Sequence, residues 1–135
     1  MIFPAILLHV LLAACESMGY APTDAERARW TMHDMRSITI AAEAYRTDHG
    51  AFPEAASLDE LTPMLSPMYI ATMPMNDAWG TPLRVESSAD GLRVISAGSD
   101  ARFDPETWTL DGPLTSFADD AMITGPRQFR RMWRF

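Results

Sequence analysis

The most regular pattern in the chain is a stripe of mainly apolar positions that predicts one long helix over residues 24–49. Thr23 to Glu26 has the sequence of a capping box, and the acidic residues Asp24 and Glu26 suit the positive end of a helix. Gly50 is a natural left-handed cap, and Pro53 prevents the helix from resuming. The stripe positions recur at intervals of three and four residues, as on one helix face: Ala28, Met32, Met35, Ile38, Ala42, Tyr45 and His49.

A second, shorter helix is predicted from a second capping sequence. Ser57-Leu58-Asp59-Glu60 repeats the capping pattern ahead of another apolar stretch, and either Pro63 or Pro67 should end that helix. Residues 66–82 are rich in proline, so we expect them to be mostly irregular.

Three short strands are predicted after the helices. Residues 83–86 and 92–95 are predicted to be two strands on either side of a turn at Ala89-Asp90-Gly91. Asp-Gly is a strong signal for the turn of a hairpin. A third strand is predicted near residues 108–110. The fold class is therefore α+β: a long N-terminal helix packed on a small antiparallel sheet of about three strands, followed by a C-terminal loop.

The charge of the chain argues against nucleic acid as a partner. The net charge is −7, from 18 acidic and 11 basic residues, and every basic residue is an arginine. Phosphate binding requires a basic field, which such a chain lacks. Residues 127–135 form a basic and aromatic tail. We expect its aromatic side chains to pack on the domain, and contact with a partner or a membrane is the alternative.

Residues 1–14 are apolar except for His9, and they precede the only cysteine of the chain. A membrane-spanning helix needs about 20 residues, so this stretch better suits the apolar region of a signal peptide. The order Leu12-Ala13-Ala14-Cys15 resembles the bacterial lipoprotein processing signal, although no arginine or lysine precedes it. The resemblance implies that Cys15 is the first mature residue, carries diacylglycerol on its sulfur and begins a tether over residues 15–22. A truncated membrane helix, or a start assigned downstream of the true one, is the alternative.

Arrangements typical of enzymes are scarce. His33 and His49 lie far more than one turn apart on the predicted helix, so they cannot form an i,i+4 metal pair. The serines lack a nucleophile-elbow pattern, and no phosphate-binding glycine-rich loop occurs. We therefore predict a protein that is not an enzyme and has no small-molecule substrate. A periplasmic hydrolase that uses loop carboxylates is the less favoured alternative.

The region after residue 99 is unusually acidic. Calcium prefers six to eight oxygen ligands, and loops offer both carboxylates and free backbone carbonyls. The spacing does not match the calcium-binding loop of an EF-hand, and composition alone favours a solvated acidic loop. The acidic residues are Asp100, Asp104, Glu106, Asp111, Asp119 and Asp120.

Four motifs in a fixed order give the chain a resemblance to a family. They are the helix end Asp34-Met35-Arg36-Ser37-Ile38 with Ala44-Tyr45-Arg46-Thr47-Asp48-His49-Gly50-Ala51-Phe52-Pro53, then residues 73–83 (Met-Pro-Met-Asn-Asp-Ala-Trp-Gly-Thr-Pro-Leu), residues 95–100 (Ile-Ser-Ala-Gly-Ser-Asp) and residues 119–123 (Asp-Asp-Ala-Met-Ile). From about residue 26 to 124, the chain resembles the globular part of the major pseudopilin of bacterial type II secretion. The pseudopilin-like domain would then span residues 23–126.

The resemblance implies a pilin-like fold whose C-terminal loop is stabilised by calcium. Carried over position by position, Asp100, Asp119 and Asp120 would be side-chain ligands, and backbone oxygens near Ile95 and Ser96 would complete the shell. Trp79, Gly80 and Pro82 would be architectural. The stretch between the first aspartate and the aspartate pair is much longer here than in the family, so Asp104 or Asp111 are possible substitutes.

The resemblance also implies a role and partners. We expect a structural component of type II secretion, or of a related envelope assembly, that contacts other pseudopilins or secretion-system proteins. The chain would face the periplasm and be held at a membrane by its lipid anchor. The alternative is a true pseudopilin with a mis-assigned start, which polymerises into a pseudopilus through an apolar stem. An in-frame glycine followed by an apolar stretch with a glutamate, upstream of Met1, would favour that alternative.

Overall fold

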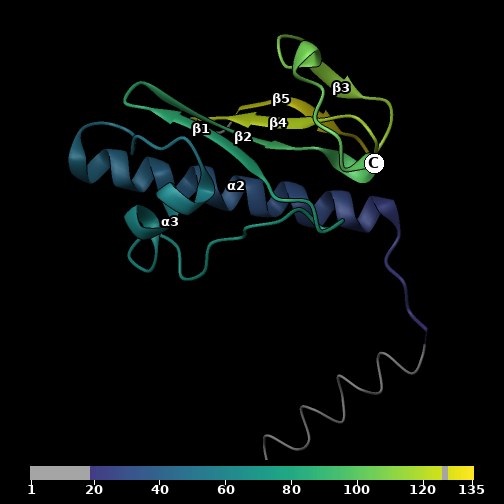
Figure 1. The fold of residues 1–135 in the computed structure, drawn as a ribbon, viewed down its shortest axis with the longest axis horizontal. Helices are drawn as coiled ribbons and strands as arrows, with labels where there is room; N and C mark the ends of the chain where they lie inside the picture. The colour runs from purple at the N-terminus through teal and green to yellow at the C-terminus, as the bar shows by residue number, and fades with distance from the viewer. Residues whose placement is uncertain (1–18, 126–127) are drawn as a thin grey trace, which may run out of the picture.

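The computed structural model describes residues 19–125 and 128–135, and it shows one long helix lying along a five-stranded sheet (Figure 1). Helix α2 spans Asp24–His49, and the short helix α3 spans Leu58–Leu65 and packs beside it. The sheet has the order β1-β2-β4-β5-β3. Two single 3₁₀ turns, η1 (Gly98–Asp100) and η2 (Pro105–Thr107), lie between β2 and β3. The α+β class and the long helix are confirmed.

The ends of α2 are fixed by the capping residues that the sequence predicts. Thr23 Oγ1 accepts from the Glu26 N–H at 3.2 Å, and the Glu26 carboxylate accepts from the Thr23 N–H at 2.8 Å. The Tyr20 hydroxyl also donates to Glu26, and this bond, ahead of those from Thr23, lowers the pKa of the Glu26 carboxyl. Gly50 ends the helix with φ 84°, and its N–H donates to Arg46 O at 2.8 Å.

Helix α3 begins at its predicted cap and continues past the first of the two candidate stop residues. Ser57 Oγ accepts from the Glu60 N–H at 3.3 Å, while the Glu60 carboxylate accepts from the Ala56 N–H. The helix includes Pro63 and ends at Leu65, two residues before Pro67. Pro63 is the sixth of the eight helical residues, so it removes one internal N–H donor, and the helix ends two residues later.

The sheet is larger than predicted and mixed in direction. Strands β1 (Arg84–Ser88) and β2 (Gly91–Ser96) form the predicted hairpin, and β4 (Ala121–Thr124) pairs antiparallel with β2. Strand β5 (Gln128–Trp133) pairs antiparallel with β4, and β3 (Gly112–Leu114) pairs parallel with β5. The expectation of about three antiparallel strands was therefore wrong.

Two local predictions differ from the observed sheet. Residues 108–110 are not a strand; they follow η2, and the third strand in sequence begins at Gly112. Residues 128–133, expected in the C-terminal tail, instead form strand β5 inside the sheet. Strand β5 buries Trp133, whose ring stands edge-on to Trp79 with centroids 5.4 Å apart. A short basic and aromatic run carries no clear periodicity, so its pairing with β4 depends on tertiary contacts.

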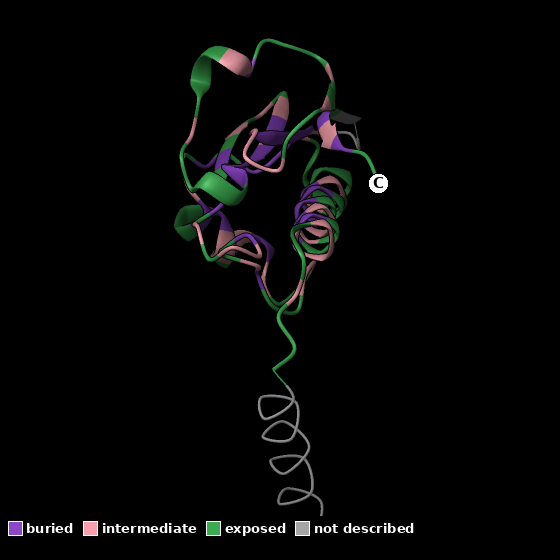
Figure 2. Cartoon of the chain, turned by 90° about the vertical axis from the view of Figure 1, so that its right-hand side faces the viewer, coloured by how far each residue is buried: buried purple, intermediate pink, exposed green. Residues whose placement is uncertain are grey.

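The main core lies between α2 and one face of the sheet. Met35, Ile38 and Ala42 are fully buried from the helix, and Val94 and Ile123 meet them from paired positions of β2 and β4. Figure 2 shows the buried residues concentrated between the helix and the strands, with the outer side of the helix largely exposed. No helix among residues 19–125 and 128–135 is long and apolar enough to cross a membrane.

The segment of residues 76–82 joins the helix to the sheet. Thr31 Oγ1 of α2 accepts from the Ala78 N–H at 2.9 Å, and Trp79 Nε1 donates to Asp24 at 2.8 Å. The buried Asp77 carboxylate accepts from the Trp79 and Thr81 N–H groups. These bonds fix the entry of the chain into β1.

We expect Thr23→Ala to destabilise the fold by about 1 kcal/mol, because it removes the side-chain acceptor at the start of α2. For a domain of this size the melting temperature should fall by roughly 4–8 °C. Thermal unfolding followed by circular dichroism would measure the change. The matched control is Thr47→Ala, whose hydroxyl only donates back to Glu43 O on an exposed helix face. An equal loss in both variants would contradict the capping role.

Candidate functional site

Gly98 brings the two halves of the predicted acidic site together. It has φ 74°, in the left-handed region, and a Cβ there would lie 2.3 Å from Phe117 O and 2.8 Å from Asp119 O. The Ser99 N–H donates to Phe117 O at 2.7 Å. Only glycine therefore permits turn η1, which carries Asp100, to pack against the segment that leads into Asp119 and Asp120.

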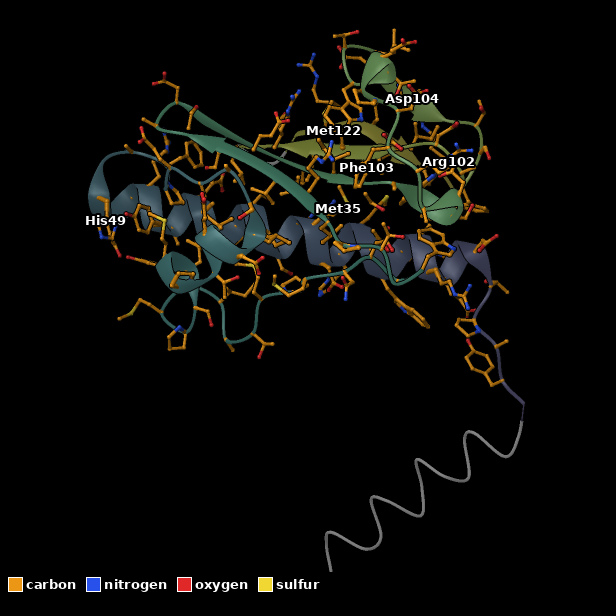
Figure 3. All side chains as sticks on the ribbon, in the orientation of Figure 1. Met35, His49, Arg102, Phe103, Asp104 and Met122 are labelled. Atoms are coloured by element: carbon orange, nitrogen blue, oxygen red, sulfur yellow. The ribbon has the colours of Figure 1, made fainter. Side chains whose placement is uncertain are left out.

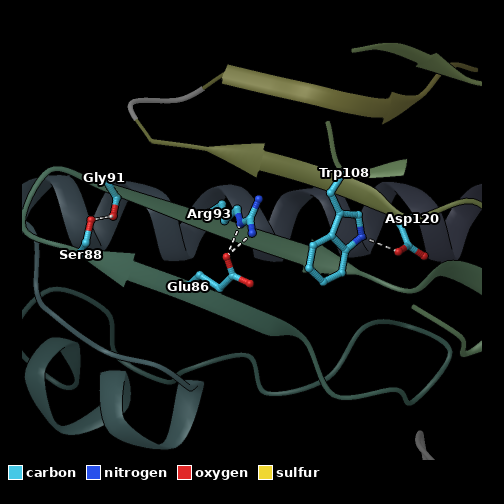
Figure 4. A network of polar contacts seen from close by, with 6 residues as sticks. All are labelled: Glu86, Ser88, Gly91, Arg93, Trp108 and Asp120. Atoms are coloured by element: carbon cyan, nitrogen blue, oxygen red, sulfur yellow. Dashed lines mark hydrogen bonds and ion pairs between the residues drawn. The ribbon is translucent and has the colours of Figure 1, made fainter. Parts of the chain in front are cut away.

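Asp120 is the buried centre of this region, with 2% of its surface exposed. Its Oδ2 accepts from Trp108 Nε1 at 2.7 Å and from the Asp104 N–H at 2.7 Å. Its Oδ1 is buried and has no hydrogen-bond partner. Figure 4 shows the indole of Trp108 directed at this carboxylate. One carboxylate oxygen therefore holds the preceding loop, and the other remains available to a ligand.

The surroundings of Asp120 favour its protonated form. Burial is the largest cause that raises the pKa of the Asp120 carboxyl, and the charges of Asp100 and Asp104 raise it further. The hydrogen bonds from Trp108 and from the Asp104 N–H act in the opposite direction. Two further acidic side chains thus lie close enough to interact electrostatically with the buried one. A cation would relieve this repulsion.

The other two predicted side-chain ligands are bound locally to the backbone. Asp100 is exposed, and its Oδ1 accepts from the Arg102 N–H at 2.9 Å. Asp119 is half-buried, and its Oδ2 accepts from the Ser116 N–H at 3.1 Å. Each carboxylate stabilises its own turn with one oxygen and leaves the second oxygen without a described hydrogen bond.

Ser96 and Ile95 lie on opposite faces of β2. The Ser96 hydroxyl donates to the buried Asp77 at 2.9 Å and accepts from the Gly98 N–H, on the face that looks toward α2. The Ile95 side chain lies on the other face, hereafter the far face, in a cluster with Trp108 and Met122. Because side chains alternate along a strand, the Ser96 hydroxyl is directed away from Asp120.

The fit of these residues to calcium rests on Asp120. Its unpartnered Oδ1 is an orphaned buried oxygen, and oxygen is the ligand that calcium prefers. Within residues 19–125 and 128–135, no three acidic, histidine or cysteine side chains are grouped so as to hold a metal. The donor chemistry therefore fits at Asp120, and the remaining ligands would have to come from Asp100, Asp104 and backbone carbonyls.

The long stretch after Asp100 covers the far face of the sheet. Residues 101–111, hereafter the cover loop, place Phe103 and Trp108 over Ile95 and Met122. Phe103 and Met122 lie on the side of the sheet away from α2, whereas Met35 lies between the helix and the sheet (Figure 3). This stretch thus builds a second, smaller hydrophobic cluster.

Arginines hold the cover loop from the strands beneath it. The Arg84 guanidinium lies 4.5 Å from the Phe103 ring centroid, and that of Arg93 lies 5.3 Å from the Trp108 ring centroid. Arg131 of β5 is buried and donates to Asp120 O and to Thr107 O. This role of Arg131 was not predicted from the sequence. The signal present was its place in a strand-length run of arginine, methionine and aromatic residues.

An open groove of about 870 Å³ lies beside the β1–β2 hairpin. Three glutamates, Glu54, Glu60 and Glu86, line it together with Arg93. Glu86 pairs with Arg93 across the hairpin, as Figure 4 shows, and Ser87 and Ser88 both donate to backbone carbonyls. The hydroxyls of Ser87 and Ser88 are therefore bonded to the backbone, and in neither of these two bonds is the partner a basic side chain that would activate the hydroxyl.

Comparisons of the chain with protein-family models, with curated proteins and with solved structures found no match. Cys15, the predicted lipidation site, lies outside the described residues.

We expect Trp108→Phe to cost about 1–3 kcal/mol of stability, because the buried Asp120 carboxylate loses one of its two donors while the ring is largely kept. Urea unfolding would measure the loss. Trp79→Phe is the matched control, since it removes an indole donor to a carboxylate that is exposed, that of Asp24. Equal losses in the two variants would show that the buried carboxylate does not depend on Trp108.

Proposed function

We propose that this chain is a non-enzymatic, pilin-like structural domain held at a membrane of the cell envelope, where it acts in type II secretion or a related assembly. The observation that carries the proposal is the arrangement of the elements. One long helix capped at both ends lies along a sheet formed by the chain that follows it, and residues 76–82 connect the two. This is the arrangement that the resemblance to the major pseudopilin implies, and the motifs that carry the resemblance occupy its joints.

The motifs lie where one element ends or where two elements are connected. The helix-end motif stops α2 at Gly50, and the Asn76–Pro82 motif binds the helix through Thr31 and Asp24. The motif of residues 95–100 ends β2 and makes the tight turn at Gly98. These motifs fix the ends of elements and the connections between them. They support a structural role, because each motif specifies backbone geometry.

The proposed partners follow from the same resemblance. They are other pseudopilins or secretion-system proteins, together with a membrane reached through a lipid on Cys15. A true pseudopilin that polymerises through an apolar stem remains the second candidate. The observation that favours this second candidate is that α2 begins only nine residues after Cys15, so the apolar run precedes it almost directly. The two candidates differ in what holds the domain at the membrane.

We also propose that the domain binds calcium with a structural role at Asp120. The buried, unpartnered Oδ1 supports this proposal, and so does the electrostatic effect of Asp100 and Asp104 on that carboxyl. Bound calcium would neutralise three carboxylates that otherwise repel one another, and it would tie turn η1 to the cover loop and β4. Asp119 and the backbone near Ile95 and Ser96 remain candidate ligands from the resemblance.

Adding calcium should raise the melting temperature of the protein, and a chelator should reverse the rise. A ligand that binds only the folded state adds about 2.7 kcal/mol of stability at 100 times its Kd. Asp120→Asn should abolish the shift, whereas Glu106→Gln, an exposed acid of the cover loop, should keep it. The same melting temperature with calcium and with chelator in the unaltered chain would refute the site.

The anchor is tested by the mass of the mature protein isolated from a bacterial host. We expect cleavage before Cys15 and an added diacylglycerol, and Cys15→Ser should leave the chain unprocessed. An intact Met1 with a free thiol at Cys15 would reject the lipid anchor. If the codons upstream of Met1 also encode a glycine-cleaved apolar stem, that result would favour the polymerising pseudopilin.

Loss of the protein from a host with a type II secretion system should leave exported enzymes in the periplasm. The full chain should restore their release into the medium, and Glu106→Gln should restore it equally. Cys15→Ser should fail to do so if the anchor is required. Normal secretion in the absence of the protein would overturn the role in secretion and would leave the fold and the anchor unaffected.

A further inference from the structure

We propose that the outer side of α2, the side turned away from the sheet, docks flat on a phospholipid surface. This outer side, hereafter the docking face, carries large apolar side chains that the core does not use. Tyr20, Trp30, Ile40 and Phe135 keep 66%, 49%, 44% and 56% of their surfaces exposed. The docking face is made of Tyr20, Arg29, Trp30, His33, Ile40 and Phe135.

Helix geometry places the α2 residues of the docking face on one side of the molecule. Positions 29, 33 and 40 repeat at helical spacing and lie opposite the buried Met35, Ile38 and Ala42. Trp30 follows Arg29 in the sequence and lies at one edge of the outer side of the helix. Figure 2, which looks along α2, shows the outer side of the helix free of other elements and the C-terminus beside it.

The aromatic side chains of the docking face are held in place. The Arg29 guanidinium lies 4.6 Å from the Phe135 ring centroid, and that ring stacks on Phe117 at 6.5 Å. The Tyr20 hydroxyl donates to Glu26, one turn before Trp30. Held aromatic rings lose little conformational entropy when they bind a surface.

The short segment between the docking face and the proposed anchor at Cys15 indicates that a membrane binds this face. Tyr20 is five positions after Cys15, and an extended chain over five steps spans at most about 17 Å. If Cys15 carries a lipid, Tyr20 cannot move farther than this from the membrane, and an apolar stem in place of the lipid gives the same limit. The docking proposal therefore rests on the proposed membrane anchor.

The side chains of the docking face suit the interfacial region of a bilayer. Tryptophan and tyrosine concentrate at the level of the headgroups, and arginine reaches lipid phosphates. Glu26 lies beside the docking face and partly offsets the charge of Arg29, so the aromatic and apolar side chains carry the proposed contact. Apolar insertion by a few rings is weak on its own, and the anchor makes it effective by keeping the docking face close to the surface.

The test uses the full chain reconstituted in phosphatidylethanolamine and phosphatidylglycerol vesicles that contain a photoactivatable phospholipid. After flotation and illumination, cleavage at arginine yields residues 30–36 and 37–46 from the docking face and residues 94–102, which carry Ile95 of the far face. We expect lipid adducts on the first two peptides and none on the third. Trp30→Ala combined with Phe135→Ala should reduce the adducts several-fold without changing flotation, whereas Leu110→Ala, which removes an exposed apolar side chain of the cover loop, should not.

The outcomes separate the docking from the anchor. A chain that floats but carries no adducts on residues 30–46, or carries equal adducts on all three peptides, overturns the docking and leaves the anchor standing. A chain that does not float overturns both. If cross-links form between copies of the chain through residues 30–46 and lipid adducts are absent, the docking face is a protein interface and the lipid proposal is wrong.

Discussion

The burial of one side of α2 against β2 and β4 is the contact on which the rest of the structure depends. Met35 and Ile38 meet Val94 and Ile123 there, and each fully buried side chain of this size contributes about 1.5–3 kcal/mol. The hydrogen bonds that Ala78 and Trp79 donate to Thr31 and Asp24 form only when the helix packs on the sheet, so the same contact fixes the path of the chain into β1. The capping residues keep the helix long enough to span the sheet.

A second constraint acts on the far face of the sheet. Ile95 and Met122 would be exposed there, and the cover loop shields them with Phe103 and Trp108. Because the entropic cost of closing a loop rises slowly with length, a long loop that buries two aromatic rings is affordable in energetic terms. Asp120 links the two faces, since its side chain holds the cover loop and its backbone directly precedes β4, the strand that packs on α2.

The features that the sequence predicts well are those with local causes. The bounds of α2 follow from Thr23, Glu26 and Gly50, which lie within a turn of the helix ends, and the hairpin follows from Asp90-Gly91. The features that were missed depend on distant partners. Strand β5 is recognisable only from its pairing with β4. Trp108 was expected in a strand because tryptophan has a high β propensity, and no residue near it in the sequence indicates its hydrogen bond to Asp120. In the candidate site, the acidic residues were predictable by type, but the burial of Asp120 and the binding of Arg131 to its carbonyl were not.

The position of β5 in the sheet has a consequence for how the chain folds as it is made. Until residues 128–133 have been synthesised, β4 has an open edge, β3 has no neighbour, and Trp79 lacks the ring of Trp133. The helix and the hairpin precede β5 in the chain, yet the sheet closes only with nearly the last residues. The complete five-stranded sheet therefore cannot form until synthesis of the chain is almost finished.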